Sequence, residues 1–112
     1  IKAAQQAGKL IIGVDSDQSH VAPRKVLTSM VKHADVAVYL GVKDVLEGKF
    51  SGGDVVLGLK EGGVGLAPFG GDVAPDARAT ALAEVERMRA EIVAGKIRVP
   101  ATVEELAQDA RK

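Results

Sequence analysis

Residues 10–15 read LIIGVD, a short apolar run that ends in a carboxylate. Such a run is typical of a central parallel strand that is buried on both faces. Two further segments are strand candidates, VLTSMV at residues 26–31 and the buried-type run DVVLGL at residues 54–59. These segments predict three strands of one sheet, and a shorter strand is expected at residues 97–99, just before Pro100.

Helical patterns separate and follow these runs. The expected helices are the end of one at residues 1–8, then residues 36–47, residues 75–94, and a last one from residue 103 to about Ala110. Asp35 is expected to cap the second helix, and Pro75 opens the third. Thr102 and Glu105 have the spacing of a capping box for the fourth. This alternation predicts an α/β fold, a mostly parallel sheet flanked by helices.

The helix expected at residues 36–47 carries one apolar stripe along a single face. Its members are Val38, Val42, Val45 and Leu46, at the spacing that lets a helix bury one side. Residues 60–72 contain five glycines, and we expect little regular structure there.

The length and composition of the chain limit the classes of protein to which it can belong. The 112 residues suit one domain, 1–112, and a compact fold would bury about 11,000 Å² of the extended chain. With 15 basic and 15 acidic residues the net charge is zero, which argues against nucleic acid as the main partner. The absence of cysteine excludes disulfides, thiolate nucleophiles and cysteine-based metal sites. The chain starts at Ile1 without a signal peptide pattern, so its simplest interpretation is a piece of a longer protein.

The stretch GVDSDQSH at residues 13–20 is the most informative candidate site. Asp15 ends a predicted strand and Asp17 follows it, and their carboxylates can bind sugar hydroxyls or a metal, or can cap backbone amides in a turn. A calcium loop is excluded because Ser19 and His20 stand where that loop needs other residues. Residue chemistry leaves both interpretations open for Asp15 and favours the capping role for Asp17.

The glycine-rich stretch GLKEGGVGLAPFGG at residues 58–71 matches no phosphate-binding loop. Lys60 precedes its glycines, and Pro68 stands where a dinucleotide loop needs glycine. Lys60 either donates to ligand hydroxyls or is solvated, and its chemistry alone favours the solvated state. His20 and His33 are interpreted as surface residues rather than metal ligands. No serine has a recognisable base partner, so we expect no enzyme, no metal and no cofactor.

Three motifs in order, GVDSDQ, VLTSMVKHADVAVY and GLKEGGVGLAPF, resemble the basic membrane protein family of ABC-transporter substrate-binding lipoproteins. That family includes purine nucleoside receptors. The resemblance implies one lobe of a type I periplasmic-binding-protein fold, corresponding to much of the C-terminal lobe of a two-lobed protein. It also implies that Asp15 and Lys60 hold the ribose hydroxyls of a nucleoside from this lobe.

The resemblance carries further expectations about partners. It implies a purine nucleoside ligand, an N-terminal lobe, an ABC permease, and an extracytoplasmic, membrane-anchored lipoprotein as the parent protein. The alternative is a ligand-sensing regulatory protein that uses the same fold. A sheet that lacks a strand exposes an unpaired edge, so we also expect either self-association of the isolated chain or a rearranged sheet.

Overall fold

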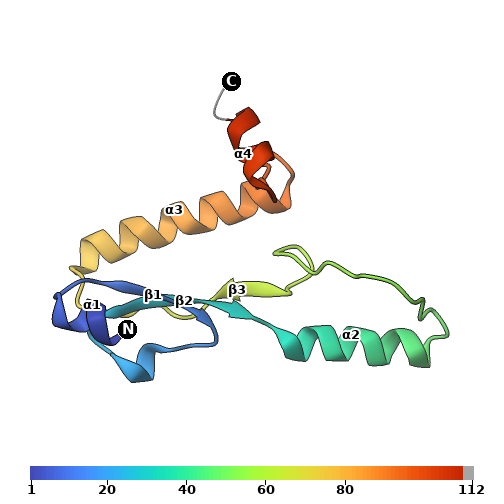
Figure 1. Cartoon of the computed structure of the whole chain (residues 1–112), viewed down its shortest axis with the longest axis horizontal. Coiled ribbons are helices and arrows are strands. Elements are labelled where there is room, and N and C mark those ends of the chain that lie inside the picture. The colour runs from blue at the N-terminus through green and yellow to red at the C-terminus, as the bar shows by residue number, and fades with distance from the viewer. Residues whose placement is uncertain (110–112) are drawn as a thin grey trace.

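The predicted strand at residues 10–15 forms β1 (Ile11–Asp15), which pairs in parallel with β2 (Val26–Lys32). The structure is a computed structural model that describes residues 1–109 (Figure 1). A short 3₁₀ helix, η1 (Ser19–Val21), lies in the loop between these two strands. Both strand predictions are therefore confirmed to within one residue.

The third strand is not the one that the sequence predicts. β3 (Val64–Leu66) lies within the glycine-rich stretch and pairs antiparallel with β2, so the sheet order is β1-β2-β3. Residues 54–58 form no regular element and Leu59 lies in a turn, and residues 97–99 form no strand either, so both of those predictions are wrong. The α/β class is confirmed, with one parallel and one antiparallel pair in a mixed sheet.

The helices follow the predicted positions closely. They are α1 (Lys2–Gln6), α2 (Ala34–Leu46), α3 (Pro75–Val93) and α4 (Val103–Asp109). Pro75 is the first residue of α3, and the Glu105 amide donates to the Thr102 hydroxyl at 3.2 Å, as the capping box predicts. The N-cap of α2 is His33 without a side-chain bond, so the cap predicted at Asp35 is wrong. The predicted end near Ala110 lies outside the described residues.

The spatial arrangement leaves one helix without a cover. Figure 1 shows α3 running across one side of the sheet, while α2 projects beyond the end of β2. A cavity of about 370 Å³ separates α3 from the sheet, between Met30 and Leu66 on the strands and Val85 and Ile92 on the helix. No described helix is long and apolar enough to cross a membrane.

The fully buried part of the molecule is small and is centred on β2. Val26 and Ser29 are completely buried, and Thr28 is nearly so. The accessible surface is 8434 Å², whereas a compact monomer of this mass exposes about 5,800 Å². The described chain therefore exposes more surface than a compact monomer of the same mass.

A hydrogen bond from the Thr28 hydroxyl connects the segment after β3 to the core of the sheet. It is buried and donates to the carbonyl of Ala67 at 2.7 Å. We expect Thr28→Val to lower the free energy of unfolding by about 1–2 kcal/mol, because the isosteric change leaves a buried carbonyl without its donor. Chemical denaturation measures this loss, and a change below about 0.3 kcal/mol would show that the bond contributes nothing.

Candidate functional site at the carboxyl end of the sheet

Two charged side chains meet where the parallel strands end. Asp15 is the last residue of β1 and lies opposite Val31, so the next residue of β2, Lys32, is its diagonal neighbour. The Lys32 ammonium lies 2.7 Å from Asp15 Oδ1, and the side chains are 62% and 67% exposed. This exposure leaves both groups accessible to a ligand, and it limits the stabilisation from the pair to about 1 kcal/mol.

Asp15 also adopts an uncommon backbone conformation. Its φ of +76° makes it the one described non-glycine residue in the left-handed region, which costs a residue with a Cβ about 1 kcal/mol or more. The turn aims the carboxylate toward Lys32 at the end of the strand. A carboxylate has room for several donors, so the second oxygen of Asp15 can accept hydroxyl groups while Oδ1 holds the ammonium.

Lys60 lies in the turn that precedes β3, not at the end of a strand. It is exposed and forms no ion pair with another described residue. Val64, four residues later, pairs with Lys32, which brings this turn to the same end of the sheet as Asp15. The expected strand end at Lys60 is therefore wrong, and its contact with a ligand remains a prediction.

The turn around Lys60 is held by a neighbouring carboxylate. Glu61 Oε2 accepts the backbone amide of Gly58 at 2.9 Å. This hydrogen bond holds the pKa of the Glu61 carboxyl below its usual range. Gly63 has no room for a side chain, because a Cβ there would lie 2.5 Å from the carbonyl oxygen of Leu57. The backbone of the turn is thus packed tightly even though Lys60 is exposed.

The loop after Asp15 is organised by short polar contacts. Asp17 Oδ1 accepts the amide of Ser19 at 2.9 Å, which matches the capping role favoured from the sequence. The backbone amide of Gln18 donates to the buried Ser29 hydroxyl at 3.1 Å. The side-chain oxygen of Gln18, Oε1, accepts a hydrogen bond from the Val14 backbone amide at 3.4 Å. These bonds tie the loop to both strands beside Asp15.

The hydrogen bond that the Ser19 backbone amide donates lowers the pKa of the Asp17 carboxyl, because it stabilises the charged form. The stabilisation is therefore present above the unfolded pKa and is lost as the pH falls through the lower folded pKa. In a carboxyl-carbon NMR titration, we expect Asp17 to titrate at lower pH in the folded chain than in a peptide of residues 13–20. Equal midpoints would contradict this hydrogen bond.

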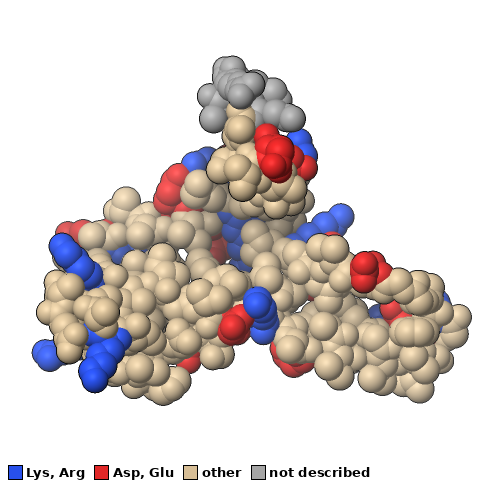
Figure 2. All heavy atoms as spheres, in the orientation of Figure 1, with Lys and Arg blue, Asp and Glu red and all other residues tan. Residues whose placement is uncertain are grey.

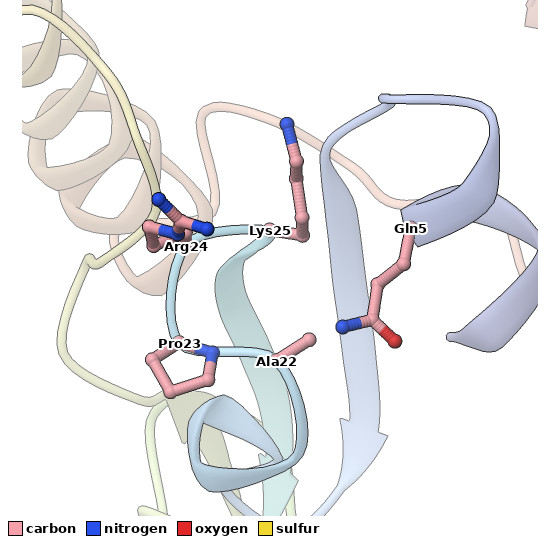
Figure 3. Close-up of a pocket in the computed structure, with 5 residues that line it drawn as sticks. All are labelled: Gln5, Ala22, Pro23, Arg24 and Lys25. Atoms are coloured by element: carbon pink, nitrogen blue, oxygen red, sulfur yellow. The ribbon is translucent and has the colours of Figure 1, made fainter.

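A second cavity lies at the opposite end of the sheet. It holds about 410 Å³ and is lined by Gln5 of α1 and the turn from Ala22 to Lys25 (Figure 3). This turn precedes β2, so the cavity adjoins the amino ends of the parallel strands, away from Asp15. Ligands of parallel sheets bind at carboxyl ends, and we therefore place the candidate site at Asp15 rather than here.

The histidines do not assemble a metal site with other described residues. No group of three or more His, Asp or Glu side chains with suitable spacing occurs within residues 1–109. His33 Nδ1 lies 3.9 Å from Asp35 Oδ1 at the start of α2. Both residues belong to the connection out of the sheet rather than to the group around Asp15.

Comparison with known proteins assigns the chain to a family. A family described as "ABC transporter substrate-binding protein PnrA-like" matches residues 1–103. The chain belongs to this family. The resemblance inferred from the three motifs is thereby confirmed, and the family is one of binding proteins rather than enzymes.

Curated relatives and solved structures agree with this membership. Basic membrane protein D of Borreliella burgdorferi is 49% identical over 70 residues, which is 59% of this chain and 20% of the relative. An uncharacterized lipoprotein of Pyrococcus abyssi is 47% identical over 62 residues, 54% of this chain and 15% of the relative. The chain thus spans about one fifth or less of the length of these relatives.

Two solved structures share the fold. A transcriptional activator of the comK gene from Bacillus halodurans has a TM-score of 0.69 and 27% identity, covering 82% of this chain and 31% of that one. A solute-binding protein of an ABC transporter system from Aeropyrum pernix K1 has a TM-score of 0.58 and 30% identity, covering 92% and 37%. The fold therefore occurs both in a transport component and in a regulator.

Sequence reasoning proposed Asp15 as a candidate and did not predict Lys32 as its neighbour. The signal was present, because Lys32 directly follows the predicted strand at residues 26–31. Parallel strands end at one edge, so the residue that ends each strand is a candidate neighbour of the other. The register that places Lys32 beside Asp15 becomes visible only with the strands in space.

Proposed function

We propose that this chain supplies part of one lobe of a two-lobed, non-enzymatic receptor that binds a purine nucleoside and delivers it to an ABC importer. Family membership supports the class of function. The observation that carries the site is the exposed Asp15 carboxylate, paired with Lys32 at the carboxyl end of a parallel strand pair. Charged acceptors bind hydroxyl groups more strongly than neutral ones do, which suits recognition of ribose.

The roles of the residues follow from their chemistry. Asp15 accepts hydrogen bonds from the ribose hydroxyls, and Lys60 donates to them from the turn before β3. Lys32 orients the carboxylate through the ion pair. The ligand is enclosed when the second lobe closes over this edge of the sheet, so each lobe alone supplies half of the contacts.

The parent protein would be an extracytoplasmic lipoprotein anchored to the membrane. Relatives with the names basic membrane protein and lipoprotein support this location. A lipidation cysteine in the sequence of the full-length protein would support it directly. A cytoplasmic protein without such a cysteine would contradict it.

Calorimetry with adenosine, guanosine and inosine tests the proposal on the full-length two-lobed protein. We expect saturable binding with one site, and binding by the 112-residue chain alone too weak to measure. The matching nucleobases should bind more weakly than the nucleosides, because they lack the hydroxyl groups. If no nucleoside binds the full-length protein, the nucleoside proposal is wrong.

A second candidate is a ligand-sensing regulator with the same fold. The similarity to the comK activator structure favours it. Ligand binding would then alter binding to DNA through a further segment, since the neutral chain is unsuited to DNA on its own. A mobility-shift assay with the full-length protein and its own promoter region, with and without nucleoside, distinguishes the two candidates.

A further inference from the structure

The loop that follows Asp15 lies directly on the sheet. It spans only residues 16–25 and contains the short helix η1, whereas a crossover between parallel strands usually takes about a dozen residues or more and an α-helix. Gly13 and Ser29 are partners in the parallel register, and a Cβ on Gly13 would lie 2.7 Å from Gln18 Oε1. These two small residues therefore leave the space that Gln18 occupies.

Gln18 is bound to both parallel strands. Its backbone amide donates to the Ser29 hydroxyl of β2 at 3.1 Å, and its Oε1 accepts the backbone amide of Val14 in β1 at 3.4 Å. Ser29 is completely buried, so it holds the loop from a fixed position. Asp15 directly follows Val14 and precedes Gln18 by three residues, and both sides of its turn are thus restrained.

This restraint accounts for the backbone conformation of Asp15. Its φ of +76° is strained for a residue with a Cβ, and such a conformation persists only where the surrounding structure holds it in place. The two hydrogen bonds of Gln18 do so, because they fix the chain before and after Asp15.

Ser29 also fixes the position of Asp15 relative to Lys32. Ser29 and Lys32 both belong to β2, and the Lys32 ammonium lies 2.7 Å from Asp15 Oδ1. Figure 2 shows acidic and basic side chains at the surface where the sheet passes into α2. The strand that carries the lysine therefore also anchors the loop that carries the carboxylate.

We infer that Ser29 is a positioning residue for Asp15, which it holds in the ligand-binding orientation through Gln18. This inference rests on the proposed role of Asp15 in nucleoside binding. Ser29 is completely buried and cannot reach a ligand itself. Its effect on affinity therefore passes through the Asp15 carboxylate.

NMR of the ligand-free full-length protein tests the positioning directly. Ser29→Ala should accelerate hydrogen exchange of the Gln18 amide by roughly tenfold or more and should shift the Cα and Cβ signals of Asp15. Thr28→Val is the matched control, because Thr28 is the neighbouring buried hydroxyl of β2 but bonds to Ala67 instead of the loop. It should leave both observables at their wild-type values. Unchanged exchange and unchanged Asp15 signals in Ser29→Ala would overturn the inference.

Calorimetry with adenosine, guanosine and inosine measures the consequence for binding. Ser29→Ala should raise the nucleoside dissociation constant about 5-fold to 20-fold, and Thr28→Val should leave it unchanged within about twofold. In an Asp15→Gly background, Ser29→Ala should change it by less than about twofold, because the carboxylate that Ser29 positions is gone. Equal losses in Ser29→Ala and Thr28→Val, or an undiminished loss in the Asp15→Gly background, would overturn the inference.

Gln18→Ala provides a second variant in case Ser29→Ala does not fold. It removes the side-chain bond to Val14 and retains the backbone bond to Ser29, so it should shift the same Asp15 signals by a smaller amount. Asp15 signals at their wild-type positions in this variant would overturn the role of Gln18 as the link. If the wild-type protein binds no nucleoside, the proposed function fails, whereas the NMR comparison still decides whether Ser29 positions Asp15.

Discussion

Replacing Asp15 should weaken purine nucleoside binding by about 1.5–3 kcal/mol in the full-length two-lobed protein, the usual scale for a hydrogen bond to a charged group. This loss corresponds to a rise in the dissociation constant of roughly 10-fold to 150-fold. The reason lies in the geometry: Asp15 ends β1 with its carboxylate exposed and oriented by Lys32. Calorimetry on wild type and variant measures the difference.

The backbone conformation of Asp15 permits a matched pair of variants. Asp15→Ala and Asp15→Gly both remove the carboxylate, but only alanine retains the strain of a Cβ at φ +76°. We expect the same loss of nucleoside affinity in both variants. Asp15→Ala should lower the free energy of unfolding by about 1 kcal/mol more than Asp15→Gly does.

The free nucleobase provides the control ligand. It has no ribose hydroxyls for Asp15 to accept, so its affinity should change by less than about threefold in either variant. Equal losses for nucleoside and base would show that Asp15 supports the structure of the lobe rather than the contact with ribose. A loss in Asp15→Ala that is absent in Asp15→Gly would assign the effect to the backbone.

The sequence predicts those elements whose signals are local. β1 is an apolar run that ends in a carboxylate, β2 is rich in apolar residues on either side of Thr28 and Ser29, and α3 begins at a proline that suits the first turn of a helix. Residues 54–59 show the limit of this reasoning. Their apolar character favours a strand, but a strand also requires a neighbour with free backbone groups, and the described chain offers none beside them.

β3 illustrates the opposite error. Glycines dominate its surroundings, and this composition suggests irregular structure. The segment nevertheless pairs with β2, because Gly62 adopts φ +74° and Gly63 lies where any side chain would meet the backbone of Leu57. The glycines permit the turn that returns the chain to the sheet, which a count of glycines does not reveal.

The candidate site is predicted only in part for the same reason. Asp15 was identifiable because it ends an apolar run, which is a local signal. Its partner Lys32 depends on the parallel register, and its φ depends on the turn toward Gln18. Lys60 was assigned through the family resemblance, and the structure places it exposed in the turn before β3, where no local signal of the sequence distinguishes it from a solvated lysine.

Gly13→Ala should lower the free energy of unfolding by about 1–3 kcal/mol, the usual range for overpacking a tight interior site. Gly13 is buried in the middle of β1, and a Cβ there would collide with the Ser29 hydroxyl and lie 2.7 Å from Gln18 Oε1. Ser29 is completely buried, so it has no space to withdraw. Chemical denaturation of the variant measures the loss.

Two further variants identify the cause of this loss. Gly52→Ala adds the same methyl group where nothing lies within 4 Å of the new Cβ, so its stability should match wild type or rise slightly. In a Ser29→Ala background, Gly13→Ala should lower the free energy of unfolding by less than it does in wild type, because the colliding oxygen is gone. If the cost is the same in both backgrounds, the collision with Ser29 is not its source, and the loss arises from displacement of Gln18 and the loop beside Asp15.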